Sequence, residues 1–395
     1  MKICIVGRGD LQLFPPLEGG SNKIYYTLKY LSLKGIKVFY VSSEHPFYFE
    51  VFKGNVKKKP YPSSLSKPVD IEQIKKIIRE LLGIPSEECI LYHPLFNTQL
   101  VKKLMYVVRK ERPQLIQAEF IGFAFPAAVV KFLFGLPVIL VEHNVECLRI
   151  KEIFPQFKRG LLFSKLIEVA LNKVSDVVIT STVEDKMRLT SLGIKKSKIV
   201  VIPHGVEVKK FEKGNGRKIR KKLNLHGTVL IFHGVLSYKP NLWAVKYIAN
   251  HLIPYLRKKR VDFSVLIVGN YPPPDIKERE IVFTGVVNNL QDYIDAADIA
   301  IVPLIAGGGM RIKILEYFAA KKPVVSTPKG IEGIHVENFK HAIITPLDEF
   351  PKYVYELIKN KKLRNYLVKN AFEFVKDFDW KKITEGYLDA FRRVL

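Results

Sequence analysis

The residues with the clearest chemical potential lie between Pro303 and Glu316. An apolar strand is expected to end at Pro303, and a glycine triplet, Gly307–Gly309, then leads into a helix. Glycines let a ligand approach the backbone closely, and a helix start offers free N–H groups and a positive dipole end. Arg311 and Lys313 add positive charge, and the Glu316 carboxylate can accept hydrogen bonds from paired hydroxyls such as those of ribose. The segment predicts a site for a phosphate or a hydroxyl-rich ring.

A second strand-to-helix junction carries an exposed cation. Gly234 follows the strand expected at Val229–His233 and permits a sharp exit from it. Lys239 then stands where it can reach an anionic ligand over the sheet edge, and Asn241 can cap the next helix. A solvated surface lysine is the competing interpretation of Lys239.

Two histidines and a glycine pair complete the candidates. His143 ends an apolar strand, where it can act as a neutral hydrogen-bond donor or acceptor near a substrate. His204, in Pro203-His204-Gly205, is explained equally well by hinge geometry. Gly19 and Gly20 precede a helix after the first strand, but no Gly-x-Gly-x-x-Gly pattern is met there.

Metal and disulfide chemistry have little support in the sequence. The nine histidines are scattered, and Cys4, Cys89 and Cys147 are far apart, so we expect buried free thiols and no resident metal. The carboxylate pair Asp377-Phe378-Asp379 is interpreted as the start of the last helix.

Both halves of the chain alternate short apolar runs with helical stretches, which predicts parallel strands with helical crossovers. We therefore expect an α/β fold of two doubly wound, Rossmann-like parallel-sheet domains, 1–204 and 205–377, that face each other across a cleft, with a helix at 378–395 packed back on the first. Residues 45–70 are expected to be irregular, and 207–217 to form the linker. The expected strands are Lys2–Gly7, Lys37–Ser42, Cys89–Tyr92, Leu115–Ala118, Val138–Glu142, Val177–Thr180, Ile199–Ile202, Val229–His233, Ser264–Val268, Ile281–Thr284, Ile299–Val302, Val324–Ser326 and Ala342–Ile344.

The chain of 395 residues is strongly basic, with 64 Lys and Arg against 38 Asp and Glu. Residues 1–200 hold 31 against 18 and the remainder 33 against 20, which favours a generally basic surface over a basic tail. The apolar stretch from Phe120 to Val141 is interpreted as a helix and a buried strand, and no signal peptide is recognised. The abundance of lysine fits a protein from a hot environment.

In their order along the chain, these motifs resemble those of the GT-B glycosyltransferases of the family 4 type. Residues 304–334 are similar to the donor-binding signature of that family. Ile202–Glu207 resembles its interdomain motif, with His204 in place of the usual Asn. The resemblance implies two facing Rossmann-like domains, a nucleoside-diphosphate sugar as donor, and transfer with retention at the anomeric carbon. It implies no metal or other cofactor.

The resemblance also implies a role for each candidate residue. Glu316 would bind the ribose hydroxyls, and Lys239 the diphosphate, together with backbone N–H groups at Gly20. Val286 would contact the base, and His143 the donor sugar near the reacting carbon. The other donor-binding positions are Gly19, His204, Gly234, Gly308, Gly309, Met310, Arg311 and Lys313.

The sequence departs from the family pattern at one position that matters. The family usually has two glutamates eight positions apart, and here Gly308 stands where the first would be. That carboxylate normally contacts the donor sugar, so the identity of the sugar, which we expect to be of the hexose type, stays open. The acceptor, a saccharide or a lipid-linked molecule, is equally open.

The expected function is synthesis of a glycan, glycolipid or cell-surface polysaccharide in the cytoplasm, with possible peripheral contact between the aromatic and basic stretch His45–Tyr61 and an anionic inner membrane face. A solvated loop is the competing interpretation of that stretch. Two other functions stay open: a nucleotide-sugar isomerase or epimerase on the same fold, and a basic nucleic-acid-binding protein. No stacking platform or recognition motif supports the second, so no nucleic acid is expected.

Overall fold

The structure, a computed structural model, describes residues 1–9, 19–67, 69–85 and 88–395. Its contacts divide the chain into two compact units. The N-terminal unit consists of Met1–Pro203 and Lys381–Leu395, and the C-terminal unit of His204–Trp380. The expectation of two α/β domains, each with a largely parallel sheet, is confirmed.

The N-terminal unit is built on an eight-stranded sheet in the order β4-β3-β2-β1-β5-β6-β7-β8. The strands from β2 to β8 in this order are parallel, and β3 and β4 add an antiparallel hairpin at one edge. The central strands are buried along almost their whole length, as expected for parallel strands that are largely apolar. The strands are β1 Lys2–Val6, β2 Lys37–Val41, β3 Phe47–Phe52, β4 Asn55–Pro60, β5 Leu115–Glu119, β6 Val138–Glu142, β7 Val177–Thr180 and β8 Ile199–Val201.

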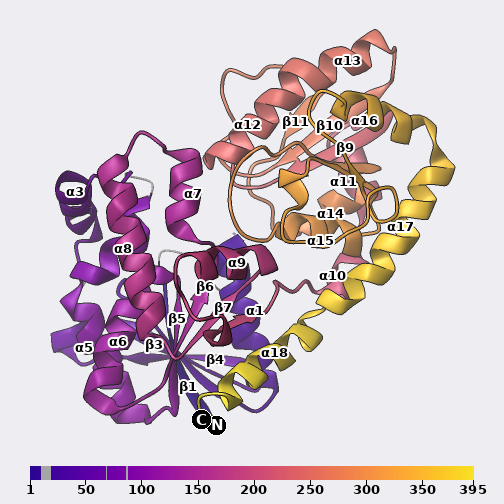
Figure 1. Cartoon of the computed structure of the whole chain (residues 1–395). Helices are drawn as coiled ribbons and strands as arrows, with labels where there is room; N and C mark the ends of the chain where they lie inside the picture. Colours follow the sequence, from indigo (N-terminus) through magenta and orange to yellow (C-terminus); the bar gives the residue numbers. More distant parts are fainter. Residues whose placement is uncertain (10–18, 68, 86–87) are drawn as a thin grey trace. The chain divides into compact units, whose positions relative to one another are not determined.

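Helices cover both faces of this sheet (Figure 1). α1 packs on β2 and β3, whereas α6 packs on β5 and β6. An ion pair between Lys34, just after α1, and Glu385 ties α18 to this unit. The helices are α1 Gly19–Leu33, α2 Ser63–Ser66, α3 Ile71–Leu82, α4 Cys89–Tyr92, η2 His93–Phe96, α5 Thr98–Glu111, η3 Ile121–Phe123, α6 Ala124–Phe134, α7 Glu146–Ile153, α8 Lys158–Val174, α9 Val183–Ser191, η4 Lys196–Lys198 and α18 Trp380–Arg392.

Two expectations for this unit are wrong. Residues 45–70 are not irregular, because they contain the β3–β4 hairpin and α2. β4 is a charged, exposed edge strand with lysines at 57–59, so it lacks the apolar run by which a strand is recognised. Cys89–Tyr92 is a fully buried helix and not a strand, since a four-residue apolar run does not distinguish the two.

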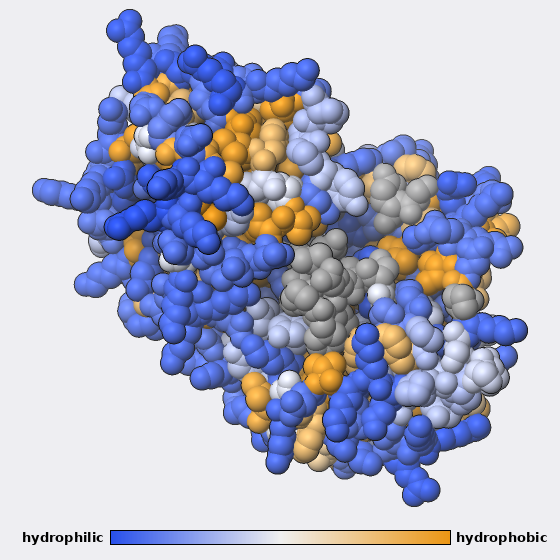
Figure 2. Space-filling model, turned by 180° about the vertical axis from the view of Figure 1, so that it is seen from behind, coloured by the Kyte–Doolittle hydropathy of each residue, from blue (hydrophilic) through white to orange (hydrophobic). Residues whose placement is uncertain are grey.

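The surface is largely hydrophilic, and the apolar stretch folds as interpreted. Hydrophilic residues predominate on the face shown in Figure 2, with apolar patches between them. The stretch from Phe120 to Val141 forms η3, α6 and most of β6, as expected. Within the described ranges, no helix has the length and hydropathy needed to cross a membrane.

The C-terminal unit is built on a six-stranded, wholly parallel sheet in the order β11-β10-β9-β12-β13-β14. The strands are β9 Thr228–His233, β10 Phe263–Val268, β11 Ile281–Phe283, β12 Ile299–Val302, β13 Val324–Ser326 and β14 Ile343–Ile344. The helices are α10 Val208–Phe211, α11 Gly216–Lys222, α12 Lys239–Tyr247, the π-helical η5 Ile248–Leu252, α13 Ile253–Lys258, α14 Leu290–Asp295, α15 Ile312–Ala319, η6 Lys329–Ile331, α16 Phe350–Lys359, α17 Lys361–Val375 and η7 Lys376–Phe378.

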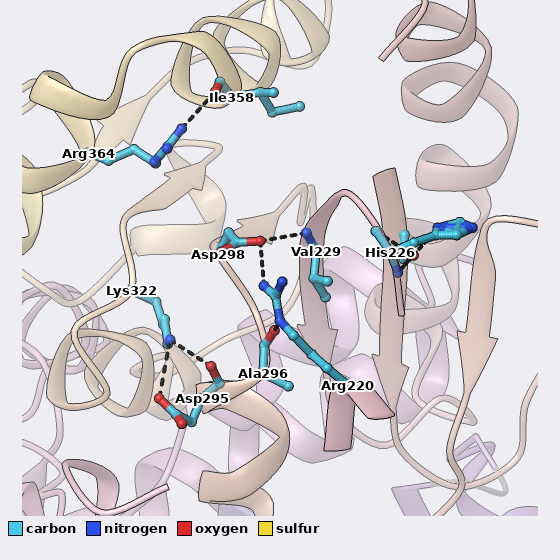
Figure 3. A network of polar contacts seen from close by, with 10 residues as sticks. Arg220, His226, Val229, Asp295, Ala296, Asp298, Lys322, Ile358 and Arg364 are labelled. Atoms are coloured by element: carbon cyan, nitrogen blue, oxygen red, sulfur yellow. Dashed lines mark hydrogen bonds and ion pairs between the residues drawn. The ribbon is translucent and has the colours of Figure 1, made fainter. Parts of the chain in front are cut away.

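The linker expected at 207–217 is instead folded into this unit as α10 and the start of α11, with Phe211 buried in the core. Figure 3 shows what anchors α11. Arg220 donates to Asp298 at 2.6 Å, and the same carboxylate accepts the Val229 N–H at 2.8 Å. This network lies at the amino ends of β9 and β12 and leaves the opposite edge of the sheet for a ligand.

Two helical glycines of the N-terminal unit provide a test of the packing. A Cβ at Gly160, in α8, would lie 2.4 Å from the backbone oxygen of Gly83, whereas a Cβ at Gly386, in α18, would make an ordinary 3.4 Å contact with Ile202. Gly160→Ala should therefore lower stability by about 2 kcal/mol. Gly386→Ala should raise it by up to about 1 kcal/mol, because alanine favours a helix. Differential scanning calorimetry measures both, and equal shifts in the two variants would contradict the packing described.

Candidate functional site

The parallel strands of the C-terminal unit end at one edge of the sheet. His233, the last residue of β9, is in register with Val268, the last residue of β10. The loops that leave these strands crowd each other, because a Cβ at Gly269 would lie 1.9 Å from the Gly234 oxygen. Both glycines have positive φ, +153° and +158°. Only glycine fits this junction. The strands β9 and β10 therefore end side by side at one edge of the sheet, and we call this edge the rim.

Glu316 lies at this rim in a defined hydrogen-bond arrangement. Its Oε2 is 2.8 Å from Nε2 of His233, and Nδ1 of the same ring is 2.8 Å from the Tyr317 hydroxyl. Both side chains of the ion pair are largely buried, with 8% of Glu316 and 11% of His233 exposed. Glu316 is the fifth residue of α15, close to the position that the sequence predicts, but its contact with His233 was not foreseen.

Lys313 lies beside the same junction. Its Nζ donates to Oδ1 of Asn241 at 3.0 Å and lies 4.1 Å from the centre of the Phe232 ring. Desolvation of the ammonium, reinforced by the charge of Arg311, lowers the pKa of Lys313 to about 7. Asn241 does not cap α12, contrary to expectation. It follows the cap residue, Tyr238, by three positions and uses its amide to donate to the Val235 carbonyl at 2.8 Å.

The glycine loop, Gly307–Gly309, adopts a backbone conformation that requires glycine. Gly307 and Gly309 have φ of +106° and +69°. A Cβ at Gly307 would approach the Tyr238 hydroxyl to 2.9 Å. Arg311 folds back and donates to the Gly308 carbonyl. The helix does not begin at Gly308–Met310, as expected, but at Ile312, because the positive φ angles of the loop are incompatible with a helix.

The remaining candidates of this unit lie in three places. The backbone N–H of His204 donates to Sδ of Met310 at 3.3 Å, so these two predicted residues are neighbours. Lys239 is the first residue of α12, next to Tyr238. Val286 follows β11, two strands away from β9, and 57% of its surface is exposed.

In the N-terminal unit, His143 follows β6 and is held firmly. Its Nε2 is 2.7 Å from Oε2 of Glu119, and its ring stacks on Phe120 with centroids 3.9 Å apart. Gln117 donates to the other oxygen of Glu119 at 2.6 Å. Burial is the main reason why the pKa of His143 is lowered, so the ring is neutral at pH 7. Glu119 gave no signal in the sequence beyond its place at a strand end.

A buried lysine lies at the carboxyl edge of the same sheet. Lys23, in the second turn of α1, donates to Oγ of Ser181 at 2.8 Å. Burial lowers its pKa to about 8, although Glu119 among other carboxylates opposes that shift. Gly19 and Gly20 are the first residues of α1. Neither Lys23 nor Ser181 was singled out in the sequence.

Behind His143 lies a group of buried carboxylates. Glu168 accepts the backbone N–H groups of Glu146 and Cys147, at 3.1 and 2.9 Å, and so caps α7. Glu142 accepts from Nδ2 of Asn172 at 2.7 Å. Burial raises the pKa of both carboxyls. Over residues 1–9, 19–67, 69–85 and 88–395, no three His, Cys, Asp or Glu side chains are arranged to hold a metal ion.

Two family models match the chain, one in each half. The model described as Glycosyltransferase Family 4 matches residues 18–210, and the model described as Glycosyl transferases group 1 matches residues 227–360.

Two relatives of this chain are described as glycosyltransferases. The chain is 25% identical over 339 residues to an uncharacterised glycosyltransferase of Methanocaldococcus jannaschii, covering 79% of this chain and 83% of that protein. It is 24% identical to a UDP-Gal:alpha-D-GlcNAc-diphosphoundecaprenol alpha-1,3-galactosyltransferase of Escherichia coli, covering 74% of this chain and 81% of that enzyme.

The fold is similar to that of sucrose-phosphate synthase from Thermosynechococcus elongatus, with a TM-score of 0.75, 15% identity and coverage of 100% and 98% of the two chains. HepE of Anabaena, solved in complex with UDP-glucose, matches with a TM-score of 0.71, 15% identity and full coverage of both chains.

These structural neighbours are GT-B glycosyltransferases, and this chain shares their fold. The chain is a GT-B glycosyltransferase of the family 4 type, as the resemblance in its sequence implies.

The pKa of Lys313 predicts a pH dependence of anion binding at the rim. A lysine with a pKa of about 7 is charged below pH 7 and increasingly neutral above it, and an anion binds the charged form. The affinity of the protein for UDP should therefore fall between pH 7.5 and 9, by up to about tenfold per pH unit. Isothermal titration calorimetry measures this.

The matched variants are Lys313→Arg, whose charge persists at these pH values, and Lys313→Met, which has none. Both should show a flat profile, with tighter binding in the arginine variant. A wild-type profile as flat as theirs would rule out Lys313 as the titrating group.

Proposed function

We propose that the chain transfers a hexose-type sugar from a nucleoside-diphosphate sugar to a hydroxyl group of an acceptor, with retention of the anomeric configuration. The observation that carries the proposal is the rim of the C-terminal unit. There, Glu316 contacts His233 at the end of β9 and Lys313 contacts Asn241, and both follow directly after the glycine loop in the sequence. A carboxylate suits the ribose hydroxyls, and cations beside open backbone suit the diphosphate.

The leaving group in this reaction is an anion, and the rim holds the groups that would stabilise it. Lys239 at the first residue of α12, together with Arg311 and Lys313, would balance the charge that develops on the diphosphate. Because three side chains can supply this charge, the proposal needs no resident metal, and activity should persist in EDTA.

The acceptor side is assigned to the N-terminal unit. His143, neutral and fixed by Glu119, would contact the donor sugar near the reacting carbon. Both oxygens of Glu119 already accept hydrogen bonds, from His143 and Gln117, which makes this carboxylate a poor nucleophile. This favours attack by the acceptor hydroxyl on the same face of the sugar, with the leaving phosphate accepting its proton.

For the substrates, we propose a UDP-sugar and a lipid-linked acceptor. HepE was solved with UDP-glucose, and the Escherichia coli relative is named for a UDP-Gal donor and a diphosphoundecaprenol acceptor. An enzyme that acts on such an acceptor works at a membrane surface, and the exposed Lys57 and Lys58 of β4 suit an anionic inner membrane face. A peripheral, cytoplasmic location is part of the proposal.

The activity test uses a panel of UDP-, GDP- and ADP-sugars with a short-chain polyprenyl-diphosphate sugar as acceptor. Glu316→Ala and Lys239→Ala should each lower kcat/KM by about 100-fold or more, because each removes a charged contact to the donor. Glu373→Ala and Lys369→Ala change exposed residues of α17 in the same unit and should leave it unchanged. Full activity in both site variants, or donor turnover that needs no acceptor, would contradict the proposal.

The stereochemical outcome is a separate prediction. Front-face attack preserves the configuration at the anomeric carbon, so an α-linked donor should give an α-linked product. The coupling constant of the anomeric proton in the NMR spectrum of the purified product measures this. A β-linked product would show that the reaction proceeds with inversion.

A further inference from the structure

His233 has no role in the function proposed so far, yet its side chain is hydrogen-bonded at both ring nitrogens. It ends β9, directly before Gly234, and contacts two consecutive residues of α15. The Tyr317 hydroxyl receives the backbone N–H of His233 at 3.0 Å and lies 2.8 Å from Nδ1 of its ring. Tyr317 is fully buried, so each of these bonds counts toward satisfying its hydroxyl.

This arrangement fixes which ring nitrogen carries the proton. Because the Tyr317 oxygen accepts the backbone N–H, its own hydrogen is free to be donated to Nδ1. The neutral ring then carries its hydrogen on Nε2, which faces Oε2 of Glu316 at 2.8 Å. The opposite tautomer would place a lone pair against the carboxylate. His233 is therefore a donor to Glu316, in the neutral form or the protonated one.

One oxygen of Glu316 is thus held inside the protein, and the other is left for a ligand. Among the residues that the structure describes, the only side-chain hydrogen bond of Glu316 is the one at Oε2. A carboxylate pinned at one oxygen cannot rotate its second oxygen away from the rim without breaking that bond.

We propose that His233 is a positioning residue, backed by Tyr317, which presents Oε1 of Glu316 to the ribose hydroxyls of the donor nucleotide. The proposal rests on the proposed function, because it assumes that a nucleotide occupies the rim. It adds a residue that confers preference for ribose over deoxyribose without touching the nucleotide.

The test compares the affinities of UDP, 2′-deoxy-UDP and 3′-deoxy-UDP by isothermal titration calorimetry. A hydrogen bond to a charged group is worth roughly tenfold or more in affinity, so wild type should prefer UDP over at least one deoxy form by that factor. In His233→Leu the ratio of the affinity for UDP to the affinity for that deoxy form should fall toward one, because UDP binding weakens while binding of the deoxy form does not change. A residue that only supports the fold would weaken all three ligands equally.

Two conservative variants complete the design. His233→Gln keeps an amide donor near the position of Nε2 and should retain most of the ribose preference. Tyr317→Phe removes the hydroxyl that fixes the tautomer and should lower the preference several-fold. If His233→Leu does not fold, as judged by its melting temperature, Tyr317→Phe decides in its place.

The outcomes separate this inference from the proposed function. Three results would overturn the inference and leave the proposed function standing. The first is that wild type binds UDP no more tightly than its deoxy forms. The others are that the ratio of these affinities does not change in His233→Leu, or does not change in Tyr317→Phe. If wild type binds none of UDP, ADP and GDP, both fail. If ADP or GDP binds in place of UDP, the same comparison is made with the deoxy forms of that nucleotide.

Discussion

In-register parallel pairing of β9 with β10 and β12 is the constraint on which the rim of the C-terminal unit depends. Parallel strands deliver all their carboxyl ends to one edge, and the strands themselves are buried, so polar groups can gather only where the strands end. The loops leaving that edge crowd each other, which is why glycine is needed at Gly234 and Gly269. At the same edge, two residues of α15 hydrogen-bond to the last residue of β9, so a side chain of the helix is held by the end of the strand.

The charged side chain of Lys313 at the rim lowers the stability of the folded protein. Lys313 is desolvated enough to lower its pKa to about 7, and its recorded hydrogen-bond partner is a neutral amide. A carboxylate close to its ammonium would compensate it better, but it would also repel a diphosphate. Lys23 of the N-terminal unit is also fully buried and donates to the hydroxyl of Ser181, but there the charges of Glu119 and other carboxylates partly compensate its ammonium.

Much of the fold and of the candidate site could be predicted from the sequence, because the signals for them are local. Runs such as Val138–Val141 are apolar throughout and mark buried parallel strands, and the glycine triplet with Glu316 lies within ten residues. Signals that depend on tertiary contacts were missed. The edge strand β4 is stabilised by pairing with β3 and not by its own apolar residues. The contact of His233 with Glu316 joins positions 83 residues apart and forms only when α15 folds next to the end of β9.

The hydrogen bonds of the two strand-end sites differ in a way that bears on mechanism. In the N-terminal unit, Glu119 accepts at both oxygens from protein groups, so His143 is held in one orientation before any ligand arrives. In the C-terminal unit, Glu316 accepts at one oxygen only, among the described residues. The hydrogen bonds of Glu119 are complete within the protein, whereas Glu316 keeps one oxygen for the ribose hydroxyls in the function proposed above. Under that proposal, binding energy gained at Glu316 would hold the nucleotide, and His143 would need no rearrangement during the reaction.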